Sequence, residues 1–241
     1  IASLPSVARN DTRRRLPKAE LLQVNGLLTE MTAAIERIMR MVAEGQAKTN
    51  RAFVVAIDGG SGALKTTTAD VLAGLIRQSG GKAVVISRDW FIDSRRRRKE
   101  RQKEELFKGQ FSLRDNEIAL RKNKFVQQVL RRIKQFNDSQ EQSIALNLSG
   151  LYYKNLPGRG GLTFALKEPI LIDRDTVVII EGNYLSVREW GGYFDLRALM
   201  LSKPSIGIKR RLPRDSYQEM VWLENVFWGV VTPSFIHYIQ N

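Results

Sequence analysis

Phe53-Val-Val-Ala-Ile-Asp-Gly-Gly-Ser-Gly-Ala-Leu-Lys-Thr-Thr-Thr68 is the stretch that decides the fold. Residues 53–57 form a continuous apolar run rich in β-branched side chains, which is typical of a strand buried on both faces. From Thr67 onward, apolar residues recur at helical spacing. The glycine cluster between these segments therefore predicts a tight loop that joins a buried strand to a helix.

This strand, glycine loop and helix have the layout of a phosphate-binding P-loop. Consecutive backbone N–H groups and the N-terminus of the helix present partial positive charge to a polyphosphate. Lys65 would add a full charge at the β- and γ-phosphates, and Thr66 a hydroxyl ligand for Mg²⁺. The pattern thus predicts ATP and Mg²⁺ as cofactors, with nucleotide contacts from Gly59, Gly60, Ser61, Gly62, Ala63, Lys65, Thr66 and Thr67.

Leu64 stands where the pattern G-x-x-x-x-G-K-S/T has its second glycine. If this position needs a positive φ, leucine costs roughly 1–2 kcal/mol in backbone energy. That energy corresponds to about a tenfold loss of nucleotide affinity. A second interpretation therefore stays open, in which the segment is a strand-turn-helix with a glycine-rich turn that binds no nucleotide.

The formal net charge of +14 is large for 241 residues and attracts nucleic acid, anionic lipid, nucleotides or an acidic protein. Aromatic residues do not interleave with the densest basic runs, 13–15 and 95–99, as a stacking platform for bases would require. A solvated or protein-facing basic surface is therefore favoured over a nucleic-acid site. The chain has no cysteine and only one histidine, His237, which excludes thiolate and multi-histidine metal sites.

The length and the 43% apolar content suit one α/β domain with an appendage. We expect residues 1–50 to form a basic arm and an amphipathic helix (apolar stripe from Glu20 to Ala47), and residues 51–241 to form the domain. No apolar run approaches the ~20 residues of a membrane span. The lack of cysteine fits an intracellular compartment, either the cytoplasm or an organelle matrix such as that of the mitochondrion. Since the first residue is Ile1, we expect a removed presequence or a trimmed chain.

Further apolar runs at 83–87, 176–180 and 196–201 predict additional strands, and 118–136 predicts a second amphipathic helix. Residues 137–170 are expected to be rich in loops. Strands that alternate with helices favour a parallel sheet covered by helices on both faces.

Short landmarks follow the glycine loop in order: Asp89-Trp-Phe91, Phe107-Lys-Gly-Gln-Phe111, Val178-Ile-Ile-Glu-Gly182, Arg210-Arg211 with Arg214-Asp215, and Thr232-Pro-Ser-Phe235. Over roughly residues 53 to 239 they resemble the uridine kinase and phosphoribulokinase family of P-loop kinases. The resemblance implies a P-loop NTPase-type fold and the transfer of a phosphoryl group to a hydroxyl, which depends on positioning and charge stabilisation.

By this resemblance, Asp89 would accept the proton of the acceptor hydroxyl, and Glu181 would hold a metal-bound water beside Thr66. Arg210, Arg211 and Arg214, with Lys65, would neutralise charge on the transferred phosphate. Plainer roles stay open: Asp89 as a helix cap, Glu181 as a strand residue bonded to a turn, and the arginines as a solvated helix face.

The chain also departs from the family pattern. Besides Leu64, the His-Pro that follows Gln-Phe in uridine kinases is absent, and Gly207 stands where the lid helix usually carries its first arginine. The favoured hypothesis is a kinase-derived structural or regulatory subunit of a larger assembly, with weakened or lost phosphotransfer. The alternatives are an active ATP-dependent kinase of a nucleoside or another small hydroxyl-bearing molecule, and a nucleic-acid-binding protein.

Overall fold

The computed structural model describes residues 18–92, 100, 122–148, 151–156, 160–166, 168–211, 228, 232 and 235–236. For residues 18–31, 122, 151–156, 160–164 and 211, it describes the backbone alone. Within this part of the chain, no helix is long and apolar enough to cross a membrane.

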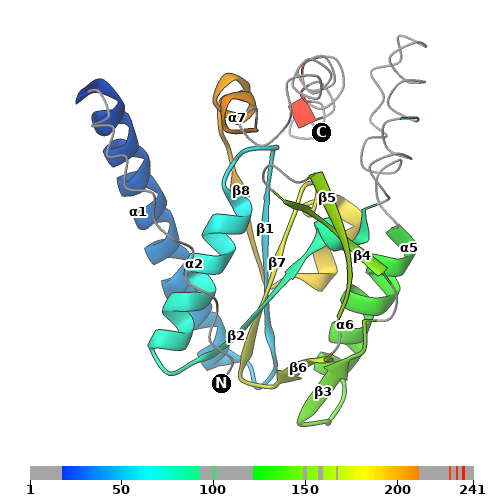
Figure 1. The fold of residues 1–241 in the computed structure, drawn as a ribbon. Coiled ribbons are helices and arrows are strands. Elements are labelled where there is room, and N and C mark those ends of the chain that lie inside the picture. Colours follow the sequence, from blue (N-terminus) through cyan, green and yellow to red (C-terminus); the bar gives the residue numbers. More distant parts are fainter. Residues whose placement is uncertain are drawn as a thin grey trace, which may run out of the picture.

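A four-stranded parallel sheet lies at the centre of the molecule, with strand order β2-β7-β1-β8 (Figure 1). These strands are β1 (Phe53–Gly59), β2 (Lys82–Ser87), β7 (Thr176–Glu181) and β8 (Leu196–Met200). Every residue of β1 and β7 is buried, as their continuous apolar runs predict. The predicted parallel arrangement is confirmed, because β7 pairs in parallel with both β1 and β2.

Helices cover both faces of this sheet. Successive side chains of a strand point to opposite faces, so one strand contributes to both cores. On one face, α1 (Lys18–Lys48) and α2 (Lys65–Gln78) pack on Val55 and Ile57 of β1. On the other, α5 (Lys122–Phe125), η2 (Val126–Leu130), α6 (Arg131–Asp138) and η3 (Arg188–Tyr193) form a core with Val54 and Ala56. The predicted α/β fold is therefore confirmed.

The expectation that residues 137–170 are mainly loops is wrong. β3 (Ser143–Leu146) pairs antiparallel with β6 (Ile170–Asp173), and β4 (Leu151–Leu156) pairs antiparallel with β5 (Gly160–Ala165). Short strands carry little periodicity, and the glycines at the start of β5 argue against a strand by composition. Pairing with a neighbouring strand, which local sequence does not show, outweighs both signals.

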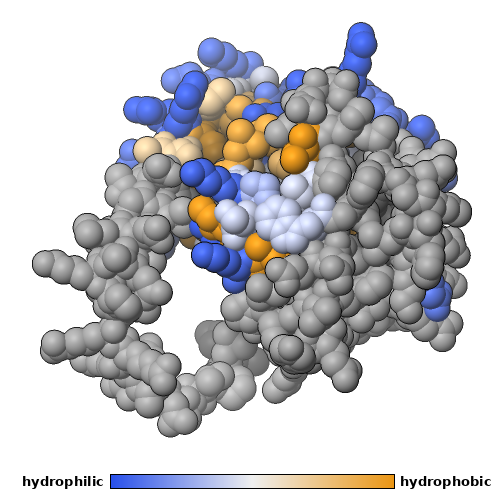
Figure 2. Space-filling view, turned by 90° about the horizontal axis from the view of Figure 1, so that it is seen from above, coloured by the Kyte–Doolittle hydropathy of each residue, from blue (hydrophilic) through white to orange (hydrophobic). Residues whose placement is uncertain are grey.

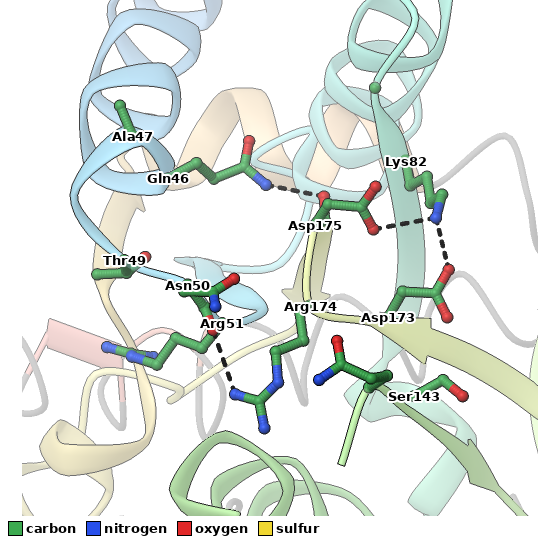
Figure 3. A pocket seen from close by; sticks show the side chains of 12 residues that line it. Gln46, Ala47, Thr49, Asn50, Arg51, Lys82, Ser143, Asp173, Arg174 and Asp175 are labelled. Atoms are coloured by element: carbon green, nitrogen blue, oxygen red, sulfur yellow. Dashed lines mark hydrogen bonds and ion pairs between the residues drawn. The ribbon is translucent and has the colours of Figure 1, made fainter. Parts of the chain in front are cut away.

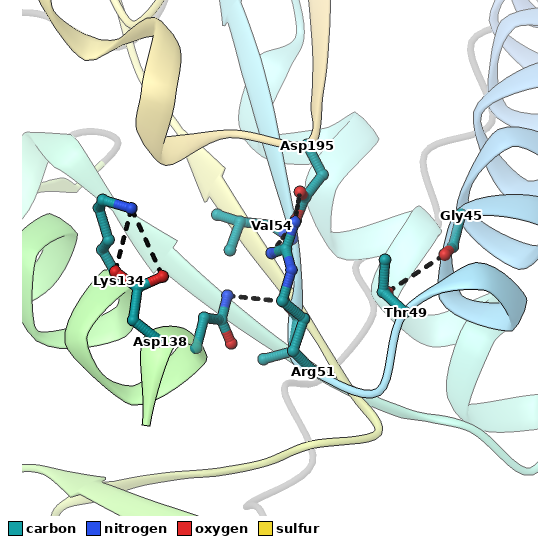
Figure 4. A network of polar contacts seen from close by, with 9 residues as sticks. Gly45, Thr49, Arg51, Val54, Lys134, Asp138 and Asp195 are labelled. Carbon is teal, nitrogen blue, oxygen red and sulfur yellow. Dashed lines mark hydrogen bonds and ion pairs between the residues drawn. The ribbon is translucent and has the colours of Figure 1, made fainter. Parts of the chain in front are cut away.

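Asp195 fixes the amino-terminal end of β1 (Figure 4). Its carboxylate accepts a hydrogen bond from the Val54 backbone N–H at 2.8 Å and another from the Arg51 guanidinium at 3.1 Å. The Asp195 side chain is only 14% exposed, so this ion pair is partly shielded from solvent. The opposite end of β1 leads into the glycine loop.

Candidate functional site

The carboxyl ends of three neighbouring parallel strands meet at the glycine loop. In register, Ile57 of β1 and Ser87 of β2 both lie opposite Glu181 of β7. In open α/β sheets, ligands bind at this edge, because loops and helix N-termini converge there. The edge is therefore the first place to look for a functional site.

The backbone of the glycine loop has the conformation that its glycines permit. Gly59 has a φ of 150°, and a Cβ there would lie 2.3 Å from the carbonyl oxygen of Met200. Gly62 has a φ of 80°, and a Cβ there would lie 2.5 Å from the carbonyl oxygen of Gly207 in α7 (Pro204–Arg211). Both positions therefore require glycine, for conformation and for space.

Leu64 has φ 64° and ψ 22°, which is the left-handed region. It is the residue that precedes the first turn of α2, and its carbonyl accepts the Thr68 N–H at 2.9 Å. This position thus has the positive φ at which a side chain is unfavourable. Leucine is therefore strained here by roughly 1–2 kcal/mol relative to a right-handed conformation.

Lys65 begins α2 and turns back over the loop. Its side chain is almost completely buried, and Nζ donates a hydrogen bond to the Gly60 carbonyl oxygen at 2.8 Å. Thr66 and Thr67 follow in the first helical turn and are exposed. The first turn of a long helix leaves backbone N–H groups without intrahelical partners, and these favour an anion.

Glu181 and Asp89 place two carboxylates beside the loop. Asp89 lies in η1 (Arg88–Phe91), directly after β2. The Ser87 hydroxyl links the two acids, since it donates to Glu181 Oε1 and accepts the Asp89 N–H at 3.2 Å. The pKa of Glu181 is raised to about 7, first by burial and second by the negative charge of Asp89, although Ser87, Lys65 and Thr66 oppose the shift. The structure thus brings Lys65, Thr66, Asp89 and Glu181 together.

Arg210 reaches the loop from α7, and its Nη1 donates to the Gly62 carbonyl oxygen at 2.9 Å. The structure describes only the backbone of Arg211, and Arg214 lies outside the described residues. The Phe235 ring also covers the loop, because a Cβ added at Gly60 would lie 3.3 Å from this ring. The Phe235 ring stands edge-on to the Tyr184 ring, and the two ring centroids are 6.2 Å apart. Figure 2 views this end of the molecule and shows weakly polar and apolar residues beside hydrophilic ones.

Asp58 is a residue of the site that was not predicted from the sequence. It is fully buried, and its carboxylate accepts the Gly59 N–H at 2.6 Å and the Ser186 N–H at 2.8 Å. One signal was available, because Asp58 is a charged residue at the end of an apolar strand and directly before the glycines. Such a residue is rarely buried unless it is paired.

The donor set fits a magnesium nucleotide. Mg²⁺ is usually held by one or two carboxylates or hydroxyls, with phosphates and water completing its octahedron. Thr66, Asp89 and Glu181 offer such oxygens, while Lys65 and the N-terminus of α2 offer positive charge. Among the described residues, no group of three or more acidic, histidine or cysteine side chains gathers to hold a metal.

A cavity of about 750 Å³ lies at the opposite edge of the sheet, between α1, β2 and the β6–β7 turn (Figure 3). Its charged groups pair with their neighbours. Lys82 Nζ lies 2.7 Å from Asp173 and 3.1 Å from Asp175, and Arg174 donates to the Asn50 carbonyl oxygen at 3.2 Å. With these charges satisfied by the protein itself, the cavity is a weaker candidate for binding than the glycine loop.

No family model and no curated protein matches the chain. Among solved structures, a possible uridine kinase from Bacillus stearothermophilus matches with a TM-score of 0.50 and 22% identity, over 85% of this chain and 95% of that one. A candidate fructose transport system kinase from Silicibacter matches with a TM-score of 0.51 and 18% identity, over 86% and 88%. The chain therefore shares the α/β fold of these two solved structures, as its sequence landmarks predict.

Proposed function

We propose that this chain is a kinase-like protein of uridine-kinase ancestry that has weakened or lost phosphotransfer and serves as a structural or regulatory subunit of a larger assembly. The observation that carries the proposal is the left-handed conformation of Leu64. A P-loop works because its N–H groups converge on phosphate oxygens with no side chain in the way. A branched side chain at the entrance to α2 opposes that arrangement, and any strain that nucleotide binding imposes on this left-handed backbone lowers the affinity further.

The lid side of the site supports the same proposal. Gly207 stands where an arginine would be expected, and its backbone packs so closely on the glycine loop that Gly62 has no room for a side chain. Arg210 is engaged with the Gly62 carbonyl rather than left to project from the helix. A guanidinium that is already hydrogen-bonded to a backbone carbonyl is less available to neutralise the charge of a transferred phosphate.

The basic surface supports a role in an assembly. A net charge of +14 raises the encounter rate with an acidic protein and is costly to keep on an isolated domain through self-repulsion. The proposed partner is therefore an acidic protein, bound in a salt-dependent way. Such a role requires the fold and the charge, and does not require turnover.

The second candidate function is an active ATP-dependent kinase of a nucleoside or another small hydroxyl-bearing molecule. The convergence of Lys65, Thr66, Asp89 and Glu181 favours it. Lys65 would release Gly60 to bind phosphate oxygens, while Thr66 and Glu181 would hold the Mg²⁺ hydration shell. Asp89 would orient the acceptor hydroxyl and take its proton. ATP, when bound, supplies the phosphoryl group.

Titration of the whole chain with ATP·Mg²⁺, monitored by calorimetry and by thermal melting, distinguishes the two candidate functions. A nucleotide at about 100 times its Kd adds about 2.7 kcal/mol to the stability of the folded protein. The Lys65→Met variant is the matched control, because it keeps the length of the side chain and removes its charge. The favoured proposal expects millimolar or undetectable binding, no consumption of ATP with a panel of nucleosides, and little change in Lys65→Met.

Micromolar binding that Lys65→Met abolishes, together with nucleoside-dependent consumption of ATP, would establish the active kinase instead. The proposed partner role has its own readout. An acidic protein that co-purifies with the chain at low salt and dissociates at high salt supports the role, while a salt-insensitive monomer in its native source contradicts it.

A further inference from the structure

We propose that Asp58 is a positioning residue that holds the glycine loop and the loop after β7 at a fixed separation. The inference rests on the proposed function, in which these loops form the nucleotide site of a kinase-derived protein. It goes beyond that function, because it assigns a role to a buried carboxylate that the proposed function does not use.

Two hydrogen bonds of the Asp58 carboxylate reach two different loops. One carboxylate oxygen accepts the N–H of Gly59, the first residue of the glycine loop, at 2.6 Å. The other accepts the N–H of Ser186, in the loop that begins at Gly182, at 2.8 Å. Gly59 and Glu181 therefore lie on chain segments that one side chain holds in place.

A backbone hydrogen bond also joins the segment that carries Glu181 to the end of β1. The Gly182 N–H, next to Glu181, donates to the Ile57 carbonyl at 3.1 Å, one residue before Asp58. Gly59 has a φ of 150° and its Cα faces the Met200 carbonyl, so its position leaves little room for adjustment. A change at Asp58 should consequently move Gly59 and the segment that carries Glu181 together.

A carboxylate suits this role better than a neutral side chain. Hydrogen bonds from backbone N–H groups to an ionised oxygen are stronger than those to an uncharged acceptor. Both oxygens of Asp58 accept, whereas an asparagine would offer one acceptor and set its NH₂ group against an N–H donor. Asp58→Asn therefore breaks one of the two links while it preserves the size and shape of the side chain.

The chain supplies a matched control in Asp195. This carboxylate also accepts a β1 backbone N–H, that of Val54, and two further hydrogen bonds from the Arg51 guanidinium, but at the far end of the strand. Asp195→Asn should thus cost comparable stability without disturbing the glycine loop. Amide hydrogen exchange followed by mass spectrometry, in peptides covering 58–66 and 181–188, reads the two loops without any nucleotide.

In Asp58→Asn, we expect exchange in both peptides to quicken by at least about tenfold, the factor that corresponds to one lost charge-assisted hydrogen bond. In Asp195→Asn, both peptides should keep their rates. Where ATP·Mg²⁺ binding is measurable, its Kd should rise about tenfold in Asp58→Asn and less than about twofold in Asp195→Asn.

Faster exchange in only one loop, or equal effects of the two variants, would overturn the proposal. If the expected exchange is seen but neither the unmodified chain nor the variants bind ATP·Mg²⁺, the positioning role stands and the active-kinase alternative fails. If Asp58→Asn does not fold, the unmodified chain still provides a test. The Gly59 and Ser186 amides must then exchange as slowly as those of β1, and rates typical of exposed loops would refute the link.

Discussion

Replacing Leu64 by glycine tests whether the left-handed backbone at the start of α2 is strained. The residue has φ 64° and ψ 22°, where a Cβ costs roughly 1–2 kcal/mol. Glycine loses about 0.5–1 kcal/mol of this gain through its greater freedom in the unfolded chain. The remaining gain is about 0.5–1 kcal/mol, apart from the contacts that the half-buried Leu64 side chain makes.

The Leu64→Ala variant isolates the backbone contribution. Alanine removes the same side-chain contacts beyond Cβ but keeps the Cβ that conflicts with a positive φ. Urea unfolding of the three proteins, analysed by linear extrapolation, should therefore find Leu64→Gly about 0.5–1 kcal/mol more stable than Leu64→Ala. Equal stabilities, or a more stable alanine variant, would show that the strain argument is wrong.

The same variants show where the strain acts. If Leu64 holds its left-handed conformation with and without nucleotide, the cost falls on folding and the ATP·Mg²⁺ affinities of the glycine and alanine variants will agree. If nucleotide binding imposes that conformation, up to about tenfold tighter binding should appear in Leu64→Gly alone. Calorimetric titration distinguishes these cases, and tighter binding by Leu64→Ala would point to steric blockage by the leucine side chain.

Two further predictions concern stability. Because burial raises the pKa of Glu181 from 4.5 to about 7, the native state binds this proton more tightly than the unfolded state, and its contribution to stability falls as pH rises from 4.5 to 7. Glu181→Gln should remove that dependence in urea unfolding at pH 5 to 8, and an unchanged slope would contradict it. Gly62→Ala should cost more than about 2 kcal/mol, because its Cβ would lie 2.5 Å from the Gly207 oxygen at a φ of 80°. In the control Gly74→Ala, whose added Cβ would meet open space in α2, the folded protein should become more stable by up to about 1 kcal/mol. If the two variants change the free energy of unfolding by the same amount, α7 does not pack closely on Gly62.

The sequence allowed the central sheet to be predicted because its two inner strands, β1 and β7, are buried on both faces. Burial of that kind leaves an uninterrupted apolar run, which Val54 and Val178 illustrate. The glycine loop could also be predicted from the sequence, since its local backbone conformation requires glycine at positions 59 and 62. These signals are local in the chain, so they are visible without the fold.

Features that depend on distant partners were not predictable. Strand β3 becomes a strand through pairing with β6, which follows it by more than 20 residues, and Asp58 becomes a link through the Ser186 N–H, which is 128 positions away. The contact of Gly62 with Gly207 likewise depends on how α7 docks. In each case the deciding energy comes from a partner that the local pattern does not contain.

The central position of β1 has a consequence for how the protein forms during synthesis. Its neighbours in the sheet come from far downstream, as the 141 positions between Val54 and Asp195 illustrate. Non-local parallel pairing is slow to form, and a waiting apolar strand is prone to association with other chains. The glycine loop therefore cannot take its final shape until β7 and β8 have left the ribosome, and this chain should depend on chaperones more than a protein whose neighbouring strands are adjacent in sequence.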